Sequence, residues 1–175
     1  YGCSMKIIND EGKVLPNEGK TFGRLMVKGP ANIERYFKSN ETALEDGWFD
    51  TGDVATIDTH GYMRIVDRSK DVIKSGGEWI SSIDLENTAV GHPGVAEACV
   101  VGVAHAKWDE RPLLFIVKNG LEECDKDSVL DYLSDKVAKW WLPDDVIFLD
   151  ELPHGATGKL LKTGLREDYK NHLMK

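Results

Sequence analysis

The sequence predicts an α+β fold, because two different patterns follow each other along its 175 residues. In the first part, short apolar runs are separated by turn-forming residues, which is typical of small antiparallel β structure. In the second part, apolar runs rich in Val and Ile, which suit buried strands, alternate with segments of helical periodicity. The polar segment 68–71 separates the two patterns. We therefore expect a joint between two modules there.

Four short strands are expected in the first part, at residues 5–8, 23–27, 54–57 and 62–66. The segment 9–12 is rich in Asn, Asp and Gly and signals a turn after the first strand, and residues 58–61 signal a turn between the last two. A few short strands bury little apolar surface, so this part is too small to hold a full core alone.

The second part is expected to form a small sheet with helices packed on it. A short helix at 84–90 follows Ser81 and Ser82, which are candidate N-caps. Apolar residues at near-helical spacing predict a second helix at 127–140, which Pro143 ends. The expected strands lie at 96–104, 113–118 and 146–149, and a polar tail follows them.

Composition restricts the function classes. Apolar residues make up 41% and charged residues 30% of the chain, as in an ordinary soluble globular protein. A net charge of −8 argues against non-specific binding to nucleic acid or to an anionic membrane. No apolar run approaches the ~20 residues that span a bilayer, so we expect no transmembrane segment. The cysteine pattern predicts no disulfide framework, so a reducing, cytoplasmic location is expected.

Cysteine and histidine spacing does not support a metal site. Cys3, Cys99 and Cys124 are far apart and form no CxxC motif, so they predict neither a disulfide framework nor a set of metal ligands. The five His are scattered as well. Cys99 lies in an apolar run, and we expect it in the core.

The stretch 48–79 carries the densest group of candidate site residues. It contains Asp53, Arg68, Lys70, Lys74, the pair Gly76-Gly77, and Trp79. A carboxylate can hold ribose hydroxyls, a guanidinium and amines can hold phosphate or ribose oxygens, and adjacent glycines let a ligand approach the backbone closely. Together these residues point to nucleotide chemistry.

Each of these residues also has a plain structural interpretation. Asp53 can cap backbone N–H groups in a turn, and the Gly-Gly pair can form a hairpin turn. The basic residues can be a solvated charged stretch, although Lys70 and Lys74 are expected to share one face of an extended segment. Trp79 can lie in the core, stack on a purine or line a channel.

A second candidate motif is the segment 153–159, PHGATGK, which ends in Lys159. It fails as a P-loop, because Pro153 stands where the first Gly would be and Leu160 replaces the hydroxyl that would hold Mg²⁺. What remains is a flexible Gly-containing loop that presents one lysine. Taken alone, this lysine could equally be an ordinary surface residue.

In their order and spacing, these motifs closely resemble the adenylate-forming superfamily, which includes acyl-CoA synthetases, peptide-synthetase adenylation domains and beetle luciferases. The blocks GGEWISSIDLEN and HPGVAEACVVGVAHAKWDERPL are similar to the fatty-acid–CoA ligase branch with medium- and long-chain members. The resemblance covers essentially the whole chain. Asp50 departs from the family, which often has Arg there, and Ser82 stands where Pro is common outside the fatty-acid branch.

This resemblance implies the C-terminal portion of a longer enzyme. Residues 1–69 would be the small, antiparallel β-barrel-like end of a large N-terminal domain, and residues 70–175 would be a compact α+β lid domain. The lid would swing about a hinge at Lys70 between two poses, one for each half-reaction.

The resemblance assigns roles in the first half-reaction. Asp53 matches the aspartate that holds the ribose hydroxyls, and Arg68 matches an arginine that also contacts ribose. Lys159 matches the catalytic lysine beside the carboxylate and the α-phosphate of ATP, two anions whose repulsion a cation offsets. Mg²⁺ is expected in the parent enzyme, but its ligands, the phosphate loop and the acid pocket lie outside these residues. We therefore expect the chain alone to be inactive.

Other residues would serve the second half-reaction, in which CoA attacks the acyl-adenylate. Lys74 and Trp79, together with Lys70, match positions that face the nucleotide. Gly76 and Gly77 match the CoA channel, where a glycine pair leaves room for the slender pantetheine arm.

The expected parent is an ATP-dependent fatty-acid–CoA ligase whose partners are a fatty acid or related carboxylate, ATP and CoA, and which releases AMP and diphosphate. Two alternatives stay open. One is a ligase for another small carboxylic acid, short-chain or sulfur-containing. The other is a non-catalytic binding module that keeps the lid fold. Acyl chain length and oligomeric state are left open.

Overall fold

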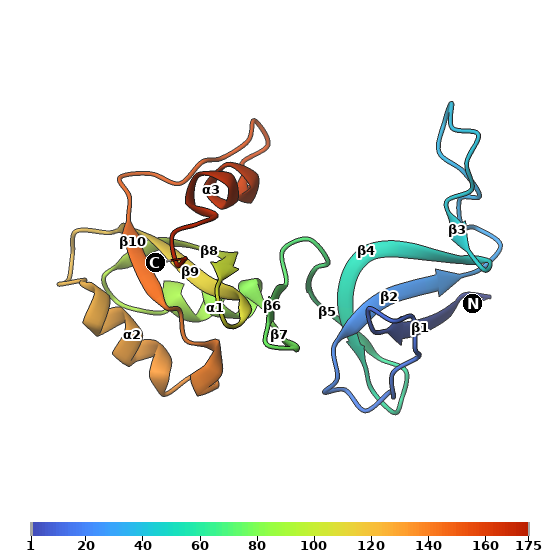
Figure 1. The fold of residues 1–175 in the computed structure, drawn as a ribbon, viewed down its shortest axis with the longest axis horizontal. Helices are drawn as coiled ribbons and strands as arrows, with labels where there is room; N and C mark the ends of the chain where they lie inside the picture. Colours follow the sequence, from blue (N-terminus) through green and yellow to red (C-terminus); the bar gives the residue numbers. More distant parts are fainter. Residues whose placement is uncertain (1, 175) are drawn as a thin grey trace. The chain divides into compact units, whose positions relative to one another are not determined.

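Two five-stranded sheets form the framework of the chain (Figure 1). The structure is a computed structural model that describes residues 2–174, and it places one sheet in each of two units. Unit 1 ends at Lys70 and unit 2 begins at Asp71, within the polar segment where the sequence indicates a joint. Because α-helices accompany the strands of unit 2, the α+β prediction is confirmed.

Unit 1 is built on an antiparallel sheet. Its strands are β1 (Ser4–Ile8), β2 (Gly23–Lys28), β3 (Leu44–Glu45), β4 (Trp48–Ile57) and β5 (Met63–Arg68). They pair in the order β1-β2-β4-β3, and β5 also pairs with β4. All four expected strands are therefore present. The third begins at Trp48, well before residue 54, because it continues through a bulge and pairs with β3 as well as β2.

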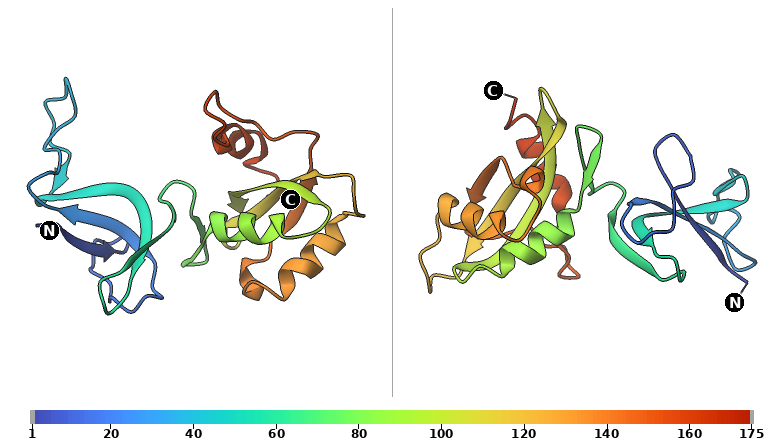
Figure 2. Two further views of the ribbon diagram at one scale, coloured as in Figure 1. Left: turned by 180° about the vertical axis from the view of Figure 1, so that it is seen from behind. Right: turned by 90° about the horizontal axis from the view of Figure 1, so that it is seen from below.

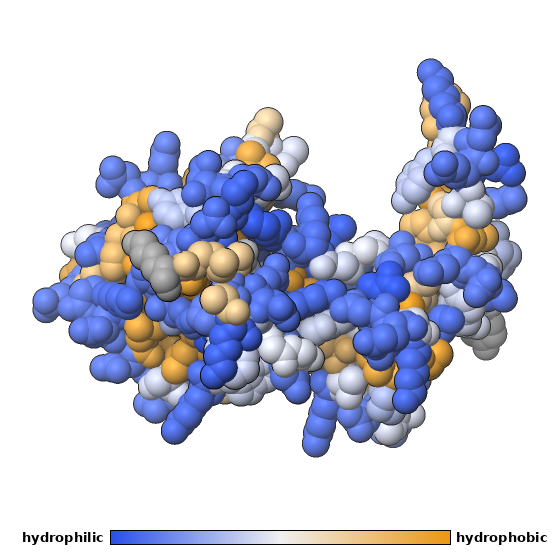
Figure 3. Space-filling view, in the orientation of Figure 1, coloured by the Kyte–Doolittle hydropathy of each residue, from blue (hydrophilic) through white to orange (hydrophobic). Residues whose placement is uncertain are grey.

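The core of unit 1 is small. Its central cluster contains Ile7, Leu25, Ala55 and Ile57 with partly buried neighbours around them, and four further apolar residues of the unit are buried, Ile8, Met26, Val54 and Val66. Larger apolar side chains stay in contact with solvent, among them Phe37, which is 91% exposed, and Tyr62, which is 76% exposed. Apolar surface is visible over this unit near β3 in Figure 3. Unit 1 thus buries little apolar area of its own, as its few short strands predict.

Unit 2 combines a sheet with helices on both of its faces. Its strands are β6 (Ile73–Ser75), β7 (Glu78–Ile80), β8 (Val95–His105), β9 (Asp109–Lys118) and β10 (Asp145–Phe148). They pair in the order β10-β9-β6-β7, with β8 also on β9, and only the β9–β10 pair is parallel. The helical segments are α1 (Ser82–Val90), α2 (Lys126–Ser134), the 3₁₀ turn η1 (Lys139–Trp141) and α3 (Lys162–Tyr169).

The long β8–β9 pair is buried on both faces, and successive side chains point into two separate cores. Leu114 and Ile116 of β9 pack with residues of α1 and α2, whereas Leu113 and Phe115 pack with Leu165 of α3. This alternation follows from the two-residue period of a strand. The right-hand view of Figure 2 shows α2 and α3 on opposite sides of the sheet.

Two sequence expectations for unit 2 are wrong. The helix expected at 127–140 ends at Ser134, because the chain turns there and brings Val137 and Trp141 onto the same core through η1. The expected polar tail contains the helix α3. A helical pattern with one buried residue, Leu165, is too sparse to be recognised in the sequence.

Other local expectations are met. Ser81 caps α1, since its hydroxyl accepts a hydrogen bond of 3.0 Å from the Asp84 N–H. The three cysteines are free, and Cys99 is fully buried. Burial, helped by the negative charge of Glu86, raises the pKa of the Cys99 thiol to about 12, which makes it an unreactive core residue.

Within residues 2–174, no helix has the length and apolar character that a bilayer crossing requires. In the same range, no three His, Cys, Asp or Glu side chains gather closely enough to hold a metal ion.

A carboxylate at the start of β10 leads to a prediction about acid stability. Partial burial acts to raise the pKa of Asp145, but hydrogen bonds with His172 (2.7 Å) and Lys126 (2.6 Å) outweigh it, and the pKa falls from 3.8 to about 2. Because the folded-state pKa is lowered, this stabilisation is present above pH ~4 and is lost as the pH falls towards 2. We expect Asp145→Asn to lower the free energy of unfolding of unit 2 by roughly 2 kcal/mol at pH 7 and hardly at all at pH 2. Urea denaturation at several pH values measures this, and an equal loss at both pH values would contradict it.

Candidate active site

A bulge in β4 presents Asp53. Gly52 has a φ of +73°, and the register between β2 and β4 shifts at this point. Asp50 accepts a hydrogen bond of 2.9 Å from the Gly52 N–H and forms an ion pair of 2.7 Å with Arg24. The capping role that Asp53 could have had in this turn therefore belongs to Asp50, and the Asp53 carboxylate makes a different contact.

That contact joins Asp53 to Arg68, its register partner on β5. Asp53 Oδ1 lies 3.1 Å from Arg68 Nε. The Asp53 side chain is 20% exposed and the Arg68 side chain 61%. The structure thus brings together two residues that were expected to share a ligand. A carboxylate that accepts, beside an exposed guanidinium that donates, can hold neighbouring hydroxyls.

Lys70 lies in the turn at 69–71 after β5, and its side chain is exposed. The turn is held by the Ser69 N–H, which donates to the Gly52 carbonyl oxygen at 2.9 Å. Because the chain turns here, Lys70 and Lys74 do not share one face of an extended segment, and that expectation is wrong. Lys74 lies in β6 instead.

The Gly-Gly pair is the turn of the β6–β7 hairpin. Gly76 and Gly77 have φ values of +58° and +88°, and two successive positive φ values fit a type I′ turn, which favours glycine at both positions. Lys74 and Trp79 face each other across this hairpin, with Lys74 Nζ 5.2 Å from the centre of the indole. Trp79 is half-buried rather than part of the core. The hairpin therefore presents a cation and an aromatic ring together.

Gly76 is also required by a close contact with Trp108, which lies just before β9. The Gly76 N–H donates to the Trp108 carbonyl oxygen at 2.9 Å. A Cβ added to Gly76 would lie 2.7 Å from Cε3 of the indole, whereas one added to Gly77 would meet no atom within 4 Å. The two glycines thus differ: the Trp108 indole lies against Gly76, and Gly77 faces open space.

A pocket of about 600 Å³ lies beside the contact between Gly76 and Trp108, and we call it the indole pocket. It is lined by Ser75, Gly76 and Glu78 of the hairpin segment, by Trp108, and by Arg111, Trp140 and Asp144. The indoles of Trp108 and Trp140 are 42% and 43% exposed. A pocket with two exposed indoles and a few polar groups is suited to a flat aromatic ligand.

Lys159 stands on a closed loop before α3. His154 and Leu160 form an antiparallel bridge, the Gly155 N–H donates to the Lys159 carbonyl oxygen at 2.8 Å, and Gly158 has a φ of +76°. The Lys159 side chain is exposed and has no hydrogen bond or ion pair with any residue that the structure describes. Its amine is therefore available to a ligand.

The two ends of this loop are anchored to different elements. His154 Nε2 lies 3.2 Å from a Glu97 oxygen of β8, and Lys162 Nζ lies 2.7 Å from a Glu86 oxygen of α1. Lys162 also donates to Ser82 Oγ at 2.7 Å. The loop lies on a different side of unit 2 from the β6–β7 hairpin in Figures 1 and 2. The candidate residues of unit 2 thus form two separate groups.

Sequence reasoning missed Trp108, Arg111 and Trp140. A signal for Trp108 exists, because a tryptophan in a polar turn between two apolar strands has no core to fill. Trp140 stands next to Trp141, and only one of the two packs against the core. Nothing in the sequence pattern marks Arg111.

Comparison with known families identifies the class of this domain. Residues 84–159, ending at the exposed lysine, match the family model of the AMP-binding enzyme C-terminal domain. The resemblance to the acyl-CoA ligases of the adenylate-forming superfamily is thereby confirmed.

Two curated relatives define the similarity further. The chain is 55% identical to the 3-methylmercaptopropionyl-CoA ligase of Ruegeria pomeroyi over 99% of its length. It is 52% identical to the medium-chain-fatty-acid–CoA ligase of Ectopseudomonas oleovorans over 100% of its length. In both cases the chain spans 32% of the relative, about a third of its length.

Solved structures agree with this similarity. ATP-bound MatB from Rhodopseudomonas palustris is 35% identical and matches with a TM-score of 0.84, covering 99% of this chain and 35% of that one. Apo MatB from the same organism matches with a TM-score of 0.67, covering 98% of this chain and 35% of that one. The α+β architecture is therefore that of adenylate-forming enzymes.

The contrast between the two glycines yields a prediction. Both Gly76→Ala and Gly77→Ala strain a backbone with positive φ, but only the first places a methyl group against the Trp108 ring. We expect Gly76→Ala to lose about 1–3 kcal/mol more stability than Gly77→Ala and to change the tryptophan near-ultraviolet circular dichroism. Urea denaturation of the pair measures the difference. Equal losses would mean that the Gly76–Trp108 contact is not tight in solution.

Proposed function

We propose that this chain is the C-terminal part of an ATP-dependent fatty-acid–CoA ligase of the cytoplasm. The enzyme would join a carboxylate to CoA through an acyl-adenylate and release AMP and diphosphate. The observation that carries the proposal is Lys159, an exposed amine on an anchored loop at the end of a segment that matches the family model of the AMP-binding enzyme C-terminal domain. The similarity to a medium-chain-fatty-acid–CoA ligase supports the class of acid.

Lys159 would act in the first half-reaction. The carboxylate of the acid attacks the α-phosphate of ATP, and both reactants are anions. An ammonium group placed between them offsets their repulsion and stabilises the negative charge that spreads in the transition state. Its exposure and lack of a partner within the described residues support this role, since a lysine held in a buried ion pair could not reach outward.

Asp53 and Arg68 would position the nucleotide. The Asp53 carboxylate would accept hydrogen bonds from the ribose hydroxyls, and the exposed Arg68 guanidinium would donate to ribose oxygens. Their contact across β4 and β5 supports a shared ligand. Lys70 would contact the nucleotide as well and serve as the hinge, and its place at the end of unit 1 supports the second role.

The β6–β7 hairpin would serve the second half-reaction. Lys74 and Trp79 would face the nucleotide, and the turn at Gly76 and Gly77 would border the channel for the thiol arm of CoA. The pocket beside Gly76 supports this placement, because its exposed indoles can stack on an adenine ring. We place the Mg²⁺ ligands in other residues of the parent enzyme.

The alternation of lid poses has indirect support. Two structures of MatB match this chain with TM-scores of 0.84 and 0.67 over nearly the same residues, so the two MatB structures differ in shape over that region. The existence of two separate groups of candidate residues in unit 2, one at Lys159 and one at the hairpin, also suits a lid that presents different faces in turn.

A second candidate substrate is a sulfur-containing acid. The similarity of 55% to a 3-methylmercaptopropionyl-CoA ligase favours it. Rates for 3-methylmercaptopropionate and for a series of fatty acids, measured on the full-length enzyme, decide between the two, because the acid with the highest kcat/KM identifies the substrate class.

The role of Lys159 leads to a prediction about the two half-reactions. In the full-length enzyme, Lys159→Ala is expected to lower adenylation at least about 100-fold, because it removes the charge that the transition state needs. Thioester formation from supplied acyl-adenylate is expected to change little. Diphosphate exchange and thioester assays measure the two steps. Lys170→Ala, which removes an exposed lysine of the same unit, is the control and should affect neither. Equal loss in both steps would contradict the proposed alternation.

The chain by itself is predicted to be inactive. The resemblance to the adenylate-forming superfamily places the phosphate loop and the acid pocket of the reaction outside these residues. We expect no acyl-CoA from the purified chain supplied with fatty acid, ATP, Mg²⁺ and CoA, as measured by chromatography. Acyl-CoA formation above the level of a Lys159→Ala sample would refute this.

A further inference from the structure

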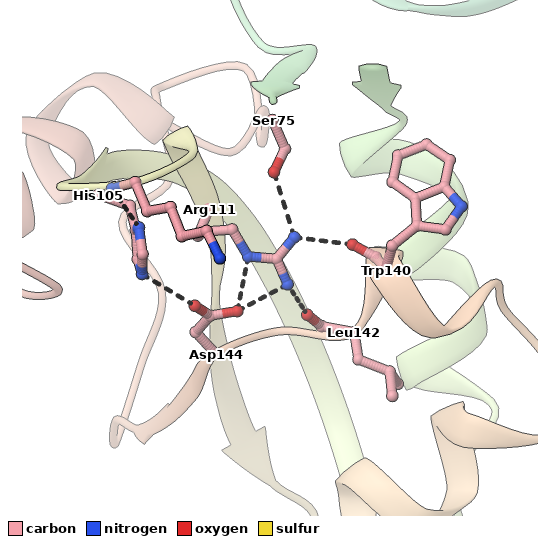
Figure 4. Close-up of polar contacts among 7 residues, drawn as sticks. Ser75, His105, Arg111, Trp140, Leu142 and Asp144 are labelled. Atoms are coloured by element: carbon pink, nitrogen blue, oxygen red, sulfur yellow. Dashed lines mark hydrogen bonds and ion pairs between the residues drawn. The ribbon is translucent and has the colours of Figure 1, made fainter. Parts of the chain in front are cut away.

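Arg111 lines the indole pocket, and its guanidinium group makes four hydrogen bonds and an ion pair (Figure 4). Nε donates to Asp144 Oδ1 at 2.7 Å, and Nη2 approaches the same oxygen at 2.7 Å. Nη2 also donates to the Leu142 carbonyl oxygen at 2.8 Å. Nη1 donates to the Trp140 carbonyl oxygen at 2.7 Å and to Ser75 Oγ at 3.2 Å. The side chain is 12% exposed.

These contacts join the segments that form the pocket. Ser75 ends β6 and directly precedes Gly76, on which the Trp108 indole rests. Trp140 and Leu142 belong to the η1 segment on the other side of the pocket. Arg111 itself is on β9, three residues after Trp108. The relative position of the two indoles therefore depends on one guanidinium.

The same contacts argue against a direct role in ligand binding. An arginine that lines a pocket invites the interpretation that it binds a phosphate group. Here, however, all three guanidinium nitrogens already donate to protein acceptors, and Asp144 neutralises the charge at 2.7 Å. An anion could bind Arg111 only by breaking contacts that hold the pocket together. Arg111 thus acts through the residues that it holds.

We propose that Arg111 is a positioning residue that sets the separation of Trp108 and Trp140 and so serves the CoA half-reaction but not adenylation. This inference rests on the proposed function of the pocket as part of the CoA site. We expect Arg111 to affect one half-reaction and not the other, because the indole pocket and the Lys159 loop are supported by different cores. Trp141 and Leu142, on the segment that Arg111 holds, pack on the core of α1 and α2. Leu160, next to Lys159, packs on the core of the opposite face of the sheet.

Arg111→Lys in the full-length enzyme tests the proposal. Lysine keeps the charge but carries one compact donor group, which cannot reach Ser75, Trp140 and Asp144 together. We expect the KM for CoA in thioester formation from supplied acyl-adenylate to rise roughly 10- to 100-fold, as displacement of binding groups by about 1 Å can cause. The rate of diphosphate exchange is expected to change less than about twofold. An equal loss in both half-reactions, or an unchanged KM for CoA, would overturn the proposal.

Arg166→Lys is the matched control. Arg166 makes a single ion pair of 2.9 Å with Asp71, which a lysine can reproduce, and it does not line the pocket. We expect neither half-reaction to change in this variant. Ser75→Ala removes only the longest of the five contacts and should raise the KM for CoA in the same direction, by about two- to fivefold. It keeps the test decisive if Arg111→Lys does not fold.

Calorimetric titration with CoA separates failure of this inference from failure of the proposed function. If wild-type enzyme and Trp108→Ala bind CoA equally well, the assignment of the indole pocket to the CoA site is refuted, and so is the role of Arg111 that rests on it. If Trp108→Ala binds CoA at least about tenfold more weakly while Arg111→Lys binds like wild type, the pocket assignment stands and the role of Arg111 is refuted. Weaker binding by both variants supports both statements.

Discussion

The β8–β9 pair is the element on which the rest of unit 2 depends. Both of its faces are covered, so its side chains must be apolar in both directions, and its central residues are fully buried. One face forms a core with α1 and α2, and the other forms a core with α3 and Leu152. Each core carries one group of candidate residues at its edge. The core with α1 and α2 carries the η1 side of the indole pocket, and the core with α3 carries the Lys159 loop. A single strand pair thus supports two candidate surfaces and keeps them apart.

Partly buried charges position the segments around these cores. Lys162 pairs with Glu86, and Glu86 also accepts a hydrogen bond of 2.7 Å from the Val100 N–H of β8. Arg111 pairs with Asp144 at the pocket. Such pairs contribute little net stability, because desolvation offsets much of their attraction, but their directional hydrogen bonds select one arrangement of the loops. Lys159 differs from them, since its charge has no partner within the described part of the chain.

Strands with strong alternation or continuous apolar runs, such as β8 and β9, were predictable, because burial on one or both faces imposes a pattern. The end of α2 and the existence of α3 were not. In α2 the apolar spacing continues past Ser134 although the helix does not. In α3 only Leu165 and Tyr169 pack on the core, and ion pairs of Lys162 and Arg166 hold the helix as well. Asp53 and Arg68 were predicted as site residues from their motifs, but their direct contact depends on the bulge and register of β4.

The sequence by itself determined the α+β class and the residue types that suit nucleotide chemistry, and it indicated a joint near Lys70, since periodicity, turn residues and charge are local properties of the chain. The tertiary structure alone decided which of these residues meet. Trp108 contacts Gly76, and Arg111 reaches Ser75, Trp140 and Asp144, only because pairing of β6 and β9 and packing of η1 bring distant segments together. Contacts of this kind depend on register and packing, which no local pattern encodes.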